Sequence, residues 1–226
     1  MNNILAIKSV VYSYKVKTGN NVNVIRHATG EFEKANMYAV LGGKGAGKTT
    51  LLKLAAGMDK VDSGVIEYKG QNINELDSYE YRSKTVGCFF EEFGLFDNYT
   101  SIDNVILQMQ INNKESVKLN EKAKELLNRV ELEQEKRYVK ASKLNGLDKK
   151  KVGLARALAT EAEIILVDDI DLNVTKNEAN GLLEIMQSLA KDDNLCIIFT
   201  TSSTDFTSLA DGVMTFNRGT AILKKE

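Results

Sequence analysis

The sequence contains no proline among its 226 residues. Because proline makes up about 5% of average usage, roughly eleven were expected. This absence excludes proline-rich and collagen-like chains, although a bias in composition is enough to explain it. No sign of charge dominates either, since 30 Lys and Arg face 31 Asp and Glu. We therefore expect no bulk attraction to nucleic acid or anionic lipid and predict that nucleic acid is not a partner.

Cysteines and long apolar runs are also scarce. Cys88 and Cys196 are too few for a disulfide framework and lie in apolar runs, which is typical of reduced core residues in a cytosolic protein. No apolar run approaches the roughly 20 residues that a membrane-spanning helix needs. The first fourteen residues alternate like a strand and lack a basic region and a cleavage site, so a signal peptide is not expected.

What is present is an alternation of short apolar segments with helical patterns. Strands are expected near residues 3–12, 22–33, 37–41, 65–68, 164–167 and 196–200, and helices near 48–57, 101–137, 149–160 and 176–191. Short, fully apolar strands between helices favour an α/β fold around a parallel sheet. The length is that of one domain, or of one domain with a sub-lobe.

A glycine-rich segment follows the expected strand at 37–41 and opens a helix at Lys48. It matches G-x-x-x-x-G-K-[ST] in the strand–loop–helix context that this phosphate-binding motif requires. Glycines let backbone N–H groups curl around a phosphate, while Lys48 neutralises the β- and γ-phosphates and Thr49 ligates Mg²⁺. The predicted nucleotide-binding residues here are Gly42, Gly43, Lys44, Gly45, Ala46, Gly47, Lys48, Thr49 and Thr50.

A second Mg²⁺ ligand is expected at Asp168. Four apolar residues precede it, so it stands at the carboxyl end of a strand, where ligands bind in open α/β sheets. The alternative is an ordinary turn residue at the end of the strand.

With these motifs in place, the sequence resembles the nucleotide-binding subunit of ATP-binding cassette (ABC) transporters. It is most similar to the subgroup that serves lipoprotein release, macrolide export and resistance to antimicrobial peptides. The order and spacing of landmarks agree over nearly the whole chain. Tyr14 stands where the family has an aromatic residue that stacks on adenine, and Leu144-Asn145-Gly146 resembles the start of the signature motif.

The resemblance implies the fold and its organisation. It implies an α/β P-loop NTPase of the ABC ATPase type, with a mixed sheet, flanking helices, an N-terminal antiparallel β part and a helical subdomain. Residues 1–226 would form one domain, with a core of residues 1–89 and 161–226 and a helical subdomain at about 90–160.

Several positions depart from the family's pattern. Asp169 stands in place of the catalytic glutamate, Ser202 in place of the switch histidine and Glu91 in place of the Q-loop glutamine. The resemblance implies catalytic positions at Asp169, Ser202 and Glu91, and metal ligands at Thr49, Asp168 and Glu91. A general base contributes about 10²–10⁴-fold and depends on reach, so the shorter Asp169 predicts slow hydrolysis. His27, the only histidine, is expected to be a strand or loop residue.

The signature motif is altered as well. In the family it contacts the γ-phosphate bound to the opposite subunit, and here it contains Asn145, Gly146, Leu147 and Asp148. Leu147 places a bulky side chain where backbone approaches the phosphate. Asp148 is expected to add negative charge beside it, which Lys149, Lys150 and Lys151 could offset. Thr175 stands in place of the D-loop aspartate.

These features predict an ATP- and Mg²⁺-binding subunit that drives or gates a membrane permease through ATP-dependent dimerisation. The alternative is a catalytically impaired subunit with a regulatory or structural role. The expected partners are the permease and a second nucleotide-binding subunit, in a homodimer or a heterodimer, on the inner face of the cell membrane. The segment from Glu92 to Phe96 is expected near the groove that receives a permease helix, or else packed under the helical lobe.

The missing prolines have a location in this comparison. The family often has proline at the positions of Val61, Asp97, Ala141, Ala162, Ile170 and Thr204. Because proline fixes φ, its loss beside the altered motifs predicts less rigid catalytic loops.

Overall fold

A computed structural model describes residues 3–15, 19, 21–90, 94–112 and 118–225. A ten-stranded sheet has the order β5-β4-β1-β2-β10-β9-β3-β8-β7-β6. The strands are β1 (Asn3–Tyr14), β2 (Val22–Glu33), β3 (Asn36–Leu41), β4 (Ser63–Tyr68), β5 (Gln71–Asn72), β6 (Val86–Phe89), β7 (Ile164–Val167), β8 (Cys196–Thr201), β9 (Gly212–Asn217) and β10 (Thr220–Lys225). The α-helices are α1 (Lys48–Ala55), α2 (Ser78–Glu80), α3 (Ser101–Ile111), α4 (Leu119–Arg129), α5 (Gly146–Leu158) and α6 (Lys176–Asp192).

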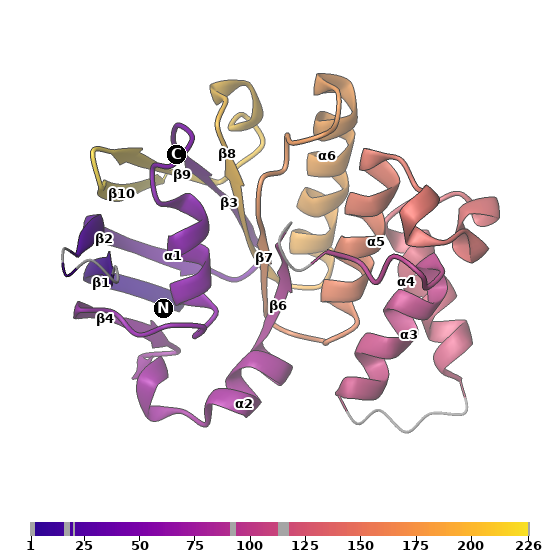
Figure 1. Cartoon of the computed structure of the whole chain (residues 1–226), viewed down its shortest axis with the longest axis horizontal. Helices are drawn as coiled ribbons and strands as arrows, with labels where there is room; N and C mark the ends of the chain where they lie inside the picture. The colour runs from indigo at the N-terminus through magenta and orange to yellow at the C-terminus, as the bar shows by residue number, and fades with distance from the viewer. Residues whose placement is uncertain (1–2, 16–18, 20, 91–93, 113–117, 226) are drawn as a thin grey trace.

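The sheet is mixed, as the ABC-type fold class predicts. Strands β6, β7, β8, β3 and β9 pair in parallel, whereas β1 pairs with β2 and β4 in antiparallel fashion. Strands β9 and β10 form an antiparallel pair that the sequence reading did not anticipate. Figure 1 shows α1 beside the antiparallel strands and α3, α4 and α5 together at the other end of the molecule.

Strands β3, β7 and β8 are buried on both faces, which explains their continuous apolar runs. Along β3, Met37 and Ala39 belong to the core cluster that includes α5 and α6, whereas Tyr38 and Val40 belong to the cluster beneath α1. Successive side chains of a strand point to opposite faces, so each residue of such a run packs against one layer or the other.

Helices α3, α4 and α5, which we call the helical layer, belong to the core cluster that also contains residues of α6. Val105 and Met109 of α3 pack in the same core as Leu126 and Leu127 of α4. Thr100 and Asp103 form a capping box that begins α3. Within the described residues, no helix has both the length and the apolar character needed to cross a membrane. The boundaries at about 90 and 160 stay a prediction.

Register at the parallel strands brings three loops to one edge of the sheet. Leu41 lies opposite Thr201, and Val167 lies opposite Phe199. The segments that leave β3, β7 and β8 therefore meet at their carboxyl ends. The phosphate loop, Asp168 and Ser202 follow these three strands directly.

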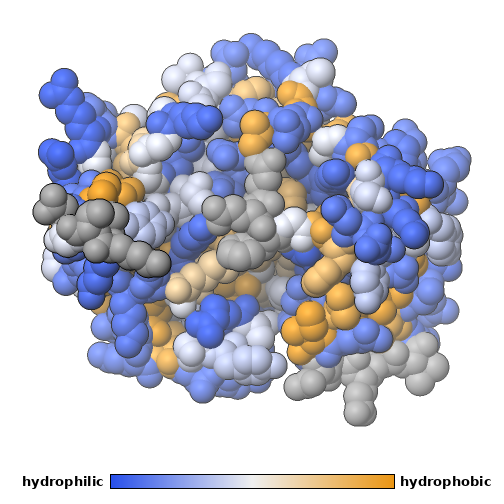
Figure 2. Space-filling model, viewed as in Figure 1, coloured by the Kyte–Doolittle hydropathy of each residue, from blue (hydrophilic) through white to orange (hydrophobic). Residues whose placement is uncertain are grey.

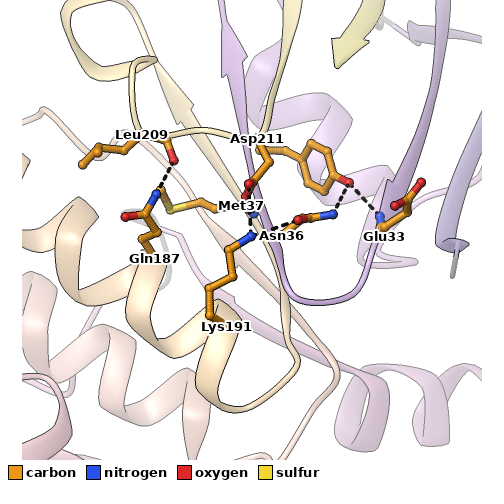
Figure 3. Close-up of polar contacts among 8 residues, drawn as sticks. Glu33, Asn36, Met37, Gln187, Lys191, Leu209 and Asp211 are labelled. Atoms are coloured by element: carbon orange, nitrogen blue, oxygen red, sulfur yellow. Dashed lines mark hydrogen bonds and ion pairs between the residues drawn. The ribbon is translucent and has the colours of Figure 1, made fainter. Parts of the chain in front are cut away.

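The opposite edge of the sheet is held by polar contacts. Asp211 accepts hydrogen bonds from the Met37 N–H at 2.8 Å and from Lys191 Nζ at 3.0 Å, and Lys191 also donates to Asn36 Oδ1 (Figure 3). These bonds fasten the segment between β8 and β9 to β3 and α6.

A second tie at this edge centres on Glu163. Its carboxylate binds Lys34 at 2.6 Å, Lys69 at 2.7 Å and the Tyr68 hydroxyl at 2.5 Å. Partial burial opposes ionisation, but the bonds from the two lysines and the tyrosine outweigh it and lower the pKa of Glu163 to about 2.

Both cysteines are free thiols, as predicted. Cys196 is buried, and Cys88 is partly exposed. Burial raises the pKa of Cys88 to about 12, so this thiol stays protonated and weakly nucleophilic at neutral pH.

Three of the positions where the family often has proline use their backbone N–H as a donor. Ala141 donates to the Tyr99 carbonyl at 2.9 Å, and Ile170 donates to the Thr200 carbonyl at 3.0 Å. Ala162 donates to Thr160 Oγ1 at 3.2 Å. Proline has no N–H, so each of these hydrogen bonds depends on the residue that stands there.

Candidate nucleotide site

The phosphate loop continues the sheet at one end and begins α1 at the other. The Gly42 N–H donates to the Thr201 carbonyl at 3.2 Å. Gly47 has a φ of 107°, in the left-handed region that favours glycine, and immediately precedes the helix. The loop therefore presents backbone N–H groups at a helix N-terminus, which is an arrangement suited to phosphate.

Lys48 lies back across this loop with its side chain buried. Its Nζ donates to the Gly42 carbonyl at 2.8 Å, to the Gly43 carbonyl at 3.2 Å and to Ser202 Oγ at 3.3 Å. All three acceptors are neutral, so these contacts leave the positive charge of the ammonium available to an anion. The structure thus brings Ser202, predicted at the switch position, next to the phosphate-binding lysine.

Asp168 is joined to two hydroxyls at the edge of the sheet. Its Oδ2 accepts from Thr49 Oγ1 at 2.8 Å, and its Oδ1 accepts from Thr200 Oγ1 at 2.7 Å. A carboxylate and a hydroxyl are hard oxygen donors, which suit Mg²⁺ completed by phosphates and water. Within the described part of the chain, no group of three or more His, Cys, Asp or Glu is placed to hold a metal by itself. Glu91, the other predicted ligand, lies outside the described residues.

Asp169 is held by its backbone in an uncommon conformation. Its φ is 46°, in the left-handed region. Its N–H donates to Thr200 Oγ1 at 2.7 Å, and its carbonyl accepts from Lys150 Nζ at 2.6 Å. Sequence reasoning missed both Thr200 and Lys150, because neither lies within a motif that predicts these contacts.

One cleft of about 580 Å³ gathers most of the predicted binding residues. Its lining consists of Tyr14, Val24, Lys44, Gly45, Ala46, Gly47, Lys48, Thr49, Thr50, Asp169, Asp171, Leu172 and Ser202. The Tyr14 hydroxyl lies 3.1 Å from Thr50 Oγ1, and its ring packs edge-on against Tyr12 at 5.0 Å between centroids. These contacts fix an aromatic ring beside the phosphate loop.

Gly146 of the signature borders a different cleft of the same chain. Gly146 lines a cavity of about 420 Å³ together with Lys149, Lys150 and Asn173. A Cβ on Gly146 would lie 2.0 Å from the Asn173 carbonyl oxygen, so only glycine permits this approach. Within one chain, the signature and the phosphate loop therefore do not form a common pocket.

The polar signature residues are engaged within the chain. Asn145 caps α5, because its side-chain oxygen accepts from the Asp148 N–H at 2.8 Å. Leu147 packs against the core cluster of the helical layer. Thr175 similarly begins α6 in a capping box with Glu178.

Asp148 does not have the surroundings that were predicted for it. The residue is only 6% exposed, and its carboxylate pairs with Lys136 Nζ at 2.5 Å. The sequence assigned the offsetting positive charge to Lys149, Lys150 and Lys151, whereas in the structure Lys136 forms the ion pair with this carboxylate. His27 behaves as expected for a strand residue, with Nε2 at 3.2 Å from Thr29 Oγ1 in β2.

Comparisons with known proteins agree with this geometry. The family model described as "ABC transporter" matches residues 25–171, which is more than half of the chain. The Bacillus subtilis protein described as "Uncharacterized ABC transporter ATP-binding protein YclH" is 25% identical over 225 residues, covering 98% of this chain and 97% of that protein. The methionine import ATP-binding protein MetN of Staphylococcus haemolyticus is 31% identical over 201 residues; the match covers 88% of this chain and 58% of MetN.

Solved structures show the same fold. The dimeric structure of MJ0796, described as a bacterial ABC transporter cassette, has a TM-score of 0.88 at 22% identity and covers 98% of both chains. The structure of cbiO1 from Clostridium perfringens has a TM-score of 0.84 at 19% identity and covers all of this chain and 89% of cbiO1. The phosphate loop, the site at the carboxyl ends of β3, β7 and β8 and the match to the family model together show that this chain belongs to the ABC transporter family, as an ATP-binding subunit.

Proposed function

We propose that the chain binds Mg-ATP in the cleft beside the phosphate loop and hydrolyses it slowly, with Asp169 as general base. One observation carries this proposal: Tyr14, the whole segment from Lys44 to Thr50, Asp169 and Ser202 border one cleft of about 580 Å³. That cleft brings together an aromatic ring, a cationic loop and a carboxylate, which suits a nucleoside triphosphate.

Each group has a task in this proposal. Adenine stacks on Tyr14, and the loop N–H groups and Lys48 bind the phosphates. Thr49 and Asp168 would hold Mg²⁺, which neutralises phosphate charge when it is bound. Glu91 stays a predicted third ligand.

Slow hydrolysis follows from the length of the Asp169 side chain. It is one methylene shorter than glutamate, and a general base acts only within hydrogen-bond reach of the proton it accepts. Ser202 Oγ lies beside Lys48 Nζ, so this hydroxyl is placed to contact a bound phosphate.

The geometry of the signature favours a second candidate function. Asn145 and Asp148 are engaged within α5 and with Lys136 instead of facing a neighbouring site. A subunit of this kind would bind ATP, close or stabilise a dimer and hold the permease in one state with little turnover.

ATP-binding subunits of this family dimerise and work with membrane permeases. The separate clefts for the phosphate loop and the signature support a head-to-tail dimer. In such a dimer the phosphate-loop cleft of each subunit would face the signature cleft of the other. The permease would hold the chain peripherally on the inner face of the cell membrane.

A permease-facing surface is proposed at the start of the helical layer. Phe96 and Tyr99 are exposed, with ring centroids 5.7 Å apart. In Figure 2, apolar side chains gather over the helices at the right of the view. Phe93, which the sequence also places here, falls outside the described residues.

Membership of the lipoprotein-release and macrolide-export subgroup is proposed from the resemblance alone. The names of other relatives specify import of methionine or of sulfate and thiosulfate by those proteins. In vesicles with the ATP-binding subunit on the outer surface and ATP added outside, solute uptake into the lumen would support the export subgroup, and release of solute from the lumen would contradict it.

The test is phosphate release by the chain with and without its permease, compared for the wild type, Lys48→Ala, Asp169→Asn and Asp169→Glu. We expect turnover above the Lys48→Ala background, a loss of at least about tenfold in Asp169→Asn and a gain of about tenfold in Asp169→Glu, within the range of general-base effects. If Mg-ATP binds but no variant exceeds the background, the regulatory function is favoured instead.

A further inference from the structure

The Asp169 backbone is hydrogen-bonded to side chains at both its N–H and its carbonyl. Thr200 Oγ1 accepts its N–H at 2.7 Å, and Lys150 Nζ donates to its carbonyl at 2.6 Å. The left-handed conformation of this residue is uncommon outside glycine and persists where the surroundings enforce it. The Asp169 carbonyl also accepts from the Leu172 N–H at 3.2 Å, and among the described contacts the Lys150 bond is the one that a charged side chain makes to this backbone.

Lys150 reaches this carbonyl from the interior of the protein. The residue is 6% exposed, and its ammonium lies 5.9 Å from the centre of the Phe89 ring at the end of β6. Lysine is seldom buried to this degree unless its charge is satisfied. The Asp169 carbonyl, at 2.6 Å, is a group that satisfies the Lys150 ammonium in this buried position.

The helix that carries Lys150 touches the loop after β7 at two points. Gly146 lies against the Asn173 carbonyl, and Lys150, four residues further and so on the same face of α5, binds Asp169. The signature helix and the loop after β7 are thereby joined through one face of α5.

We propose that Lys150 is a positioning residue that holds the Asp169 backbone in its left-handed conformation and so determines where the Asp169 carboxylate lies in the nucleotide cleft. The proposal rests on the proposed function of Asp169 as the general base. A short carboxylate has few torsions with which to correct its position, so its reach depends on the direction of its Cα–Cβ bond. A misplacement of about 1 Å lowers a rate by about 10²-fold.

The same helix provides a matched control in Lys151. Its Nζ donates to the Glu131 carbonyl at 2.9 Å, and Glu131 also has a left-handed φ, of 57°. Glu131 follows α4 and lines neither the nucleotide cleft nor the cavity at the signature. Lys151→Met therefore removes the same kind of bond at a place that does not affect Asp169.

The experiment compares the full chain with Lys150→Met, Lys150→Arg and Lys151→Met. Three quantities are measured: Mg-ATP affinity, steady-state kcat and KM, and hydrogen exchange over residues 168–173. Lys150→Met should lower kcat by about tenfold or more while KM and affinity stay within about twofold. It should also speed exchange of the Ile170 amide, which binds the Thr200 carbonyl. Lys150→Arg, which keeps a donor, should restore most of kcat, and Lys151→Met should resemble the wild type.

A double substitution tests the link to Asp169. In the Asp169→Asn background, Lys150→Met should add little further loss, because both changes act on one group. Full additivity, or equal effects of Lys150→Met and Lys151→Met on both kcat and exchange, would overturn the proposal. If even the wild type shows no turnover, the function proposed for Asp169 fails separately. Faster exchange in Lys150→Met alone would then still support the backbone role, and equal exchange would reject it.

Discussion

The phosphate-loop side of the site and the signature side use their polar groups in opposite ways. Lys48 contacts only neutral oxygens in its described bonds, and its loop borders an open cleft. On the signature side, the Asn145 side chain accepts from the Asp148 N–H, and the Asp148 carboxylate pairs with Lys136. The first side keeps its charge available to a ligand, whereas the second uses its charge to hold α5 in place. Nucleotide binding and the proposed contribution to a second subunit's site therefore depend on separate sets of residues.

Lys48→Ala should weaken nucleotide binding at the phosphate loop and leave the signature side unchanged. We expect Mg-ATP affinity to fall by about 10²-fold, because removing one partner of a buried charged contact costs about 2–5 kcal/mol. Titration calorimetry measures this change. Lys176→Ala, which removes an exposed pair with Asp205, provides the control and should leave affinity unchanged. An equal affinity in the wild type and in Lys48→Ala would contradict the assignment of the cleft.

Lys136→Met should destabilise the signature side instead. It leaves the buried Asp148 carboxylate without its ammonium partner, so the free energy of unfolding should fall by about 1–3 kcal/mol. Urea denaturation measures the change. The double variant with Asp148→Asn should recover part of the loss, since the unpaired charge is gone. No change in the single variant would show that the pair is merely a surface contact.

Proline substitutions can probe both sides, since Ala141 lies before the signature and Thr204 follows the switch position. Ala141 and Thr204 each begin a short 3₁₀ helix, but the Ala141 N–H is bonded to the Tyr99 carbonyl. Ala141→Pro should lower stability by about 1 kcal/mol or more because it removes this bond. Thr204→Pro should be neutral or stabilise the chain by up to about 1 kcal/mol, since proline suits a first helical position. Thermal unfolding of both variants checks the sign, and a reversed order would refute the reasoning.

Glu163 lies at the opposite edge of the sheet from the phosphate-loop side and the signature side. Its protonation should therefore affect stability independently of both. Its folded pKa of about 2 is below the unfolded value of 4.5, so it contributes stability above that unfolded value. This contribution should be lost as pH falls from about 5 towards 2. Glu163→Gln should flatten the pH dependence of the unfolding free energy in that window, as measured by chemical denaturation at several pH values. Parallel profiles for both proteins would contradict the role of this cluster.

The parts of the fold that the sequence predicted are those with a local pattern. The run from Met37 into the glycines and the run from Ile164 to Asp168 each combine a buried strand with a loop, and both are confirmed as strands. Strand β9 alternates over only six residues, and in β10 only Ala221 is buried, so neither has the continuous apolar run by which the buried strands were predicted.

The candidate site shows the same limit. The residues of the phosphate loop are adjacent in sequence, so their grouping could be predicted. The partnership of Asp148 with Lys136 could not, because only the packing of α5 brings them together. Lys150 is similar: nothing near it in the sequence indicates a contact with Asp169, nineteen residues away. Glu91 stays a prediction.

The order of the strands also bears on how copies of the chain can associate. The outer strands of the sheet are short, with two residues in β5 and four in β6. An edge this short offers few backbone donors and acceptors to a neighbouring strand, and natural sheets use this device against edge-to-edge aggregation. Association by extension of the sheet is therefore disfavoured. Contacts between copies would then be made by side chains of loops and helices instead of by strand pairing.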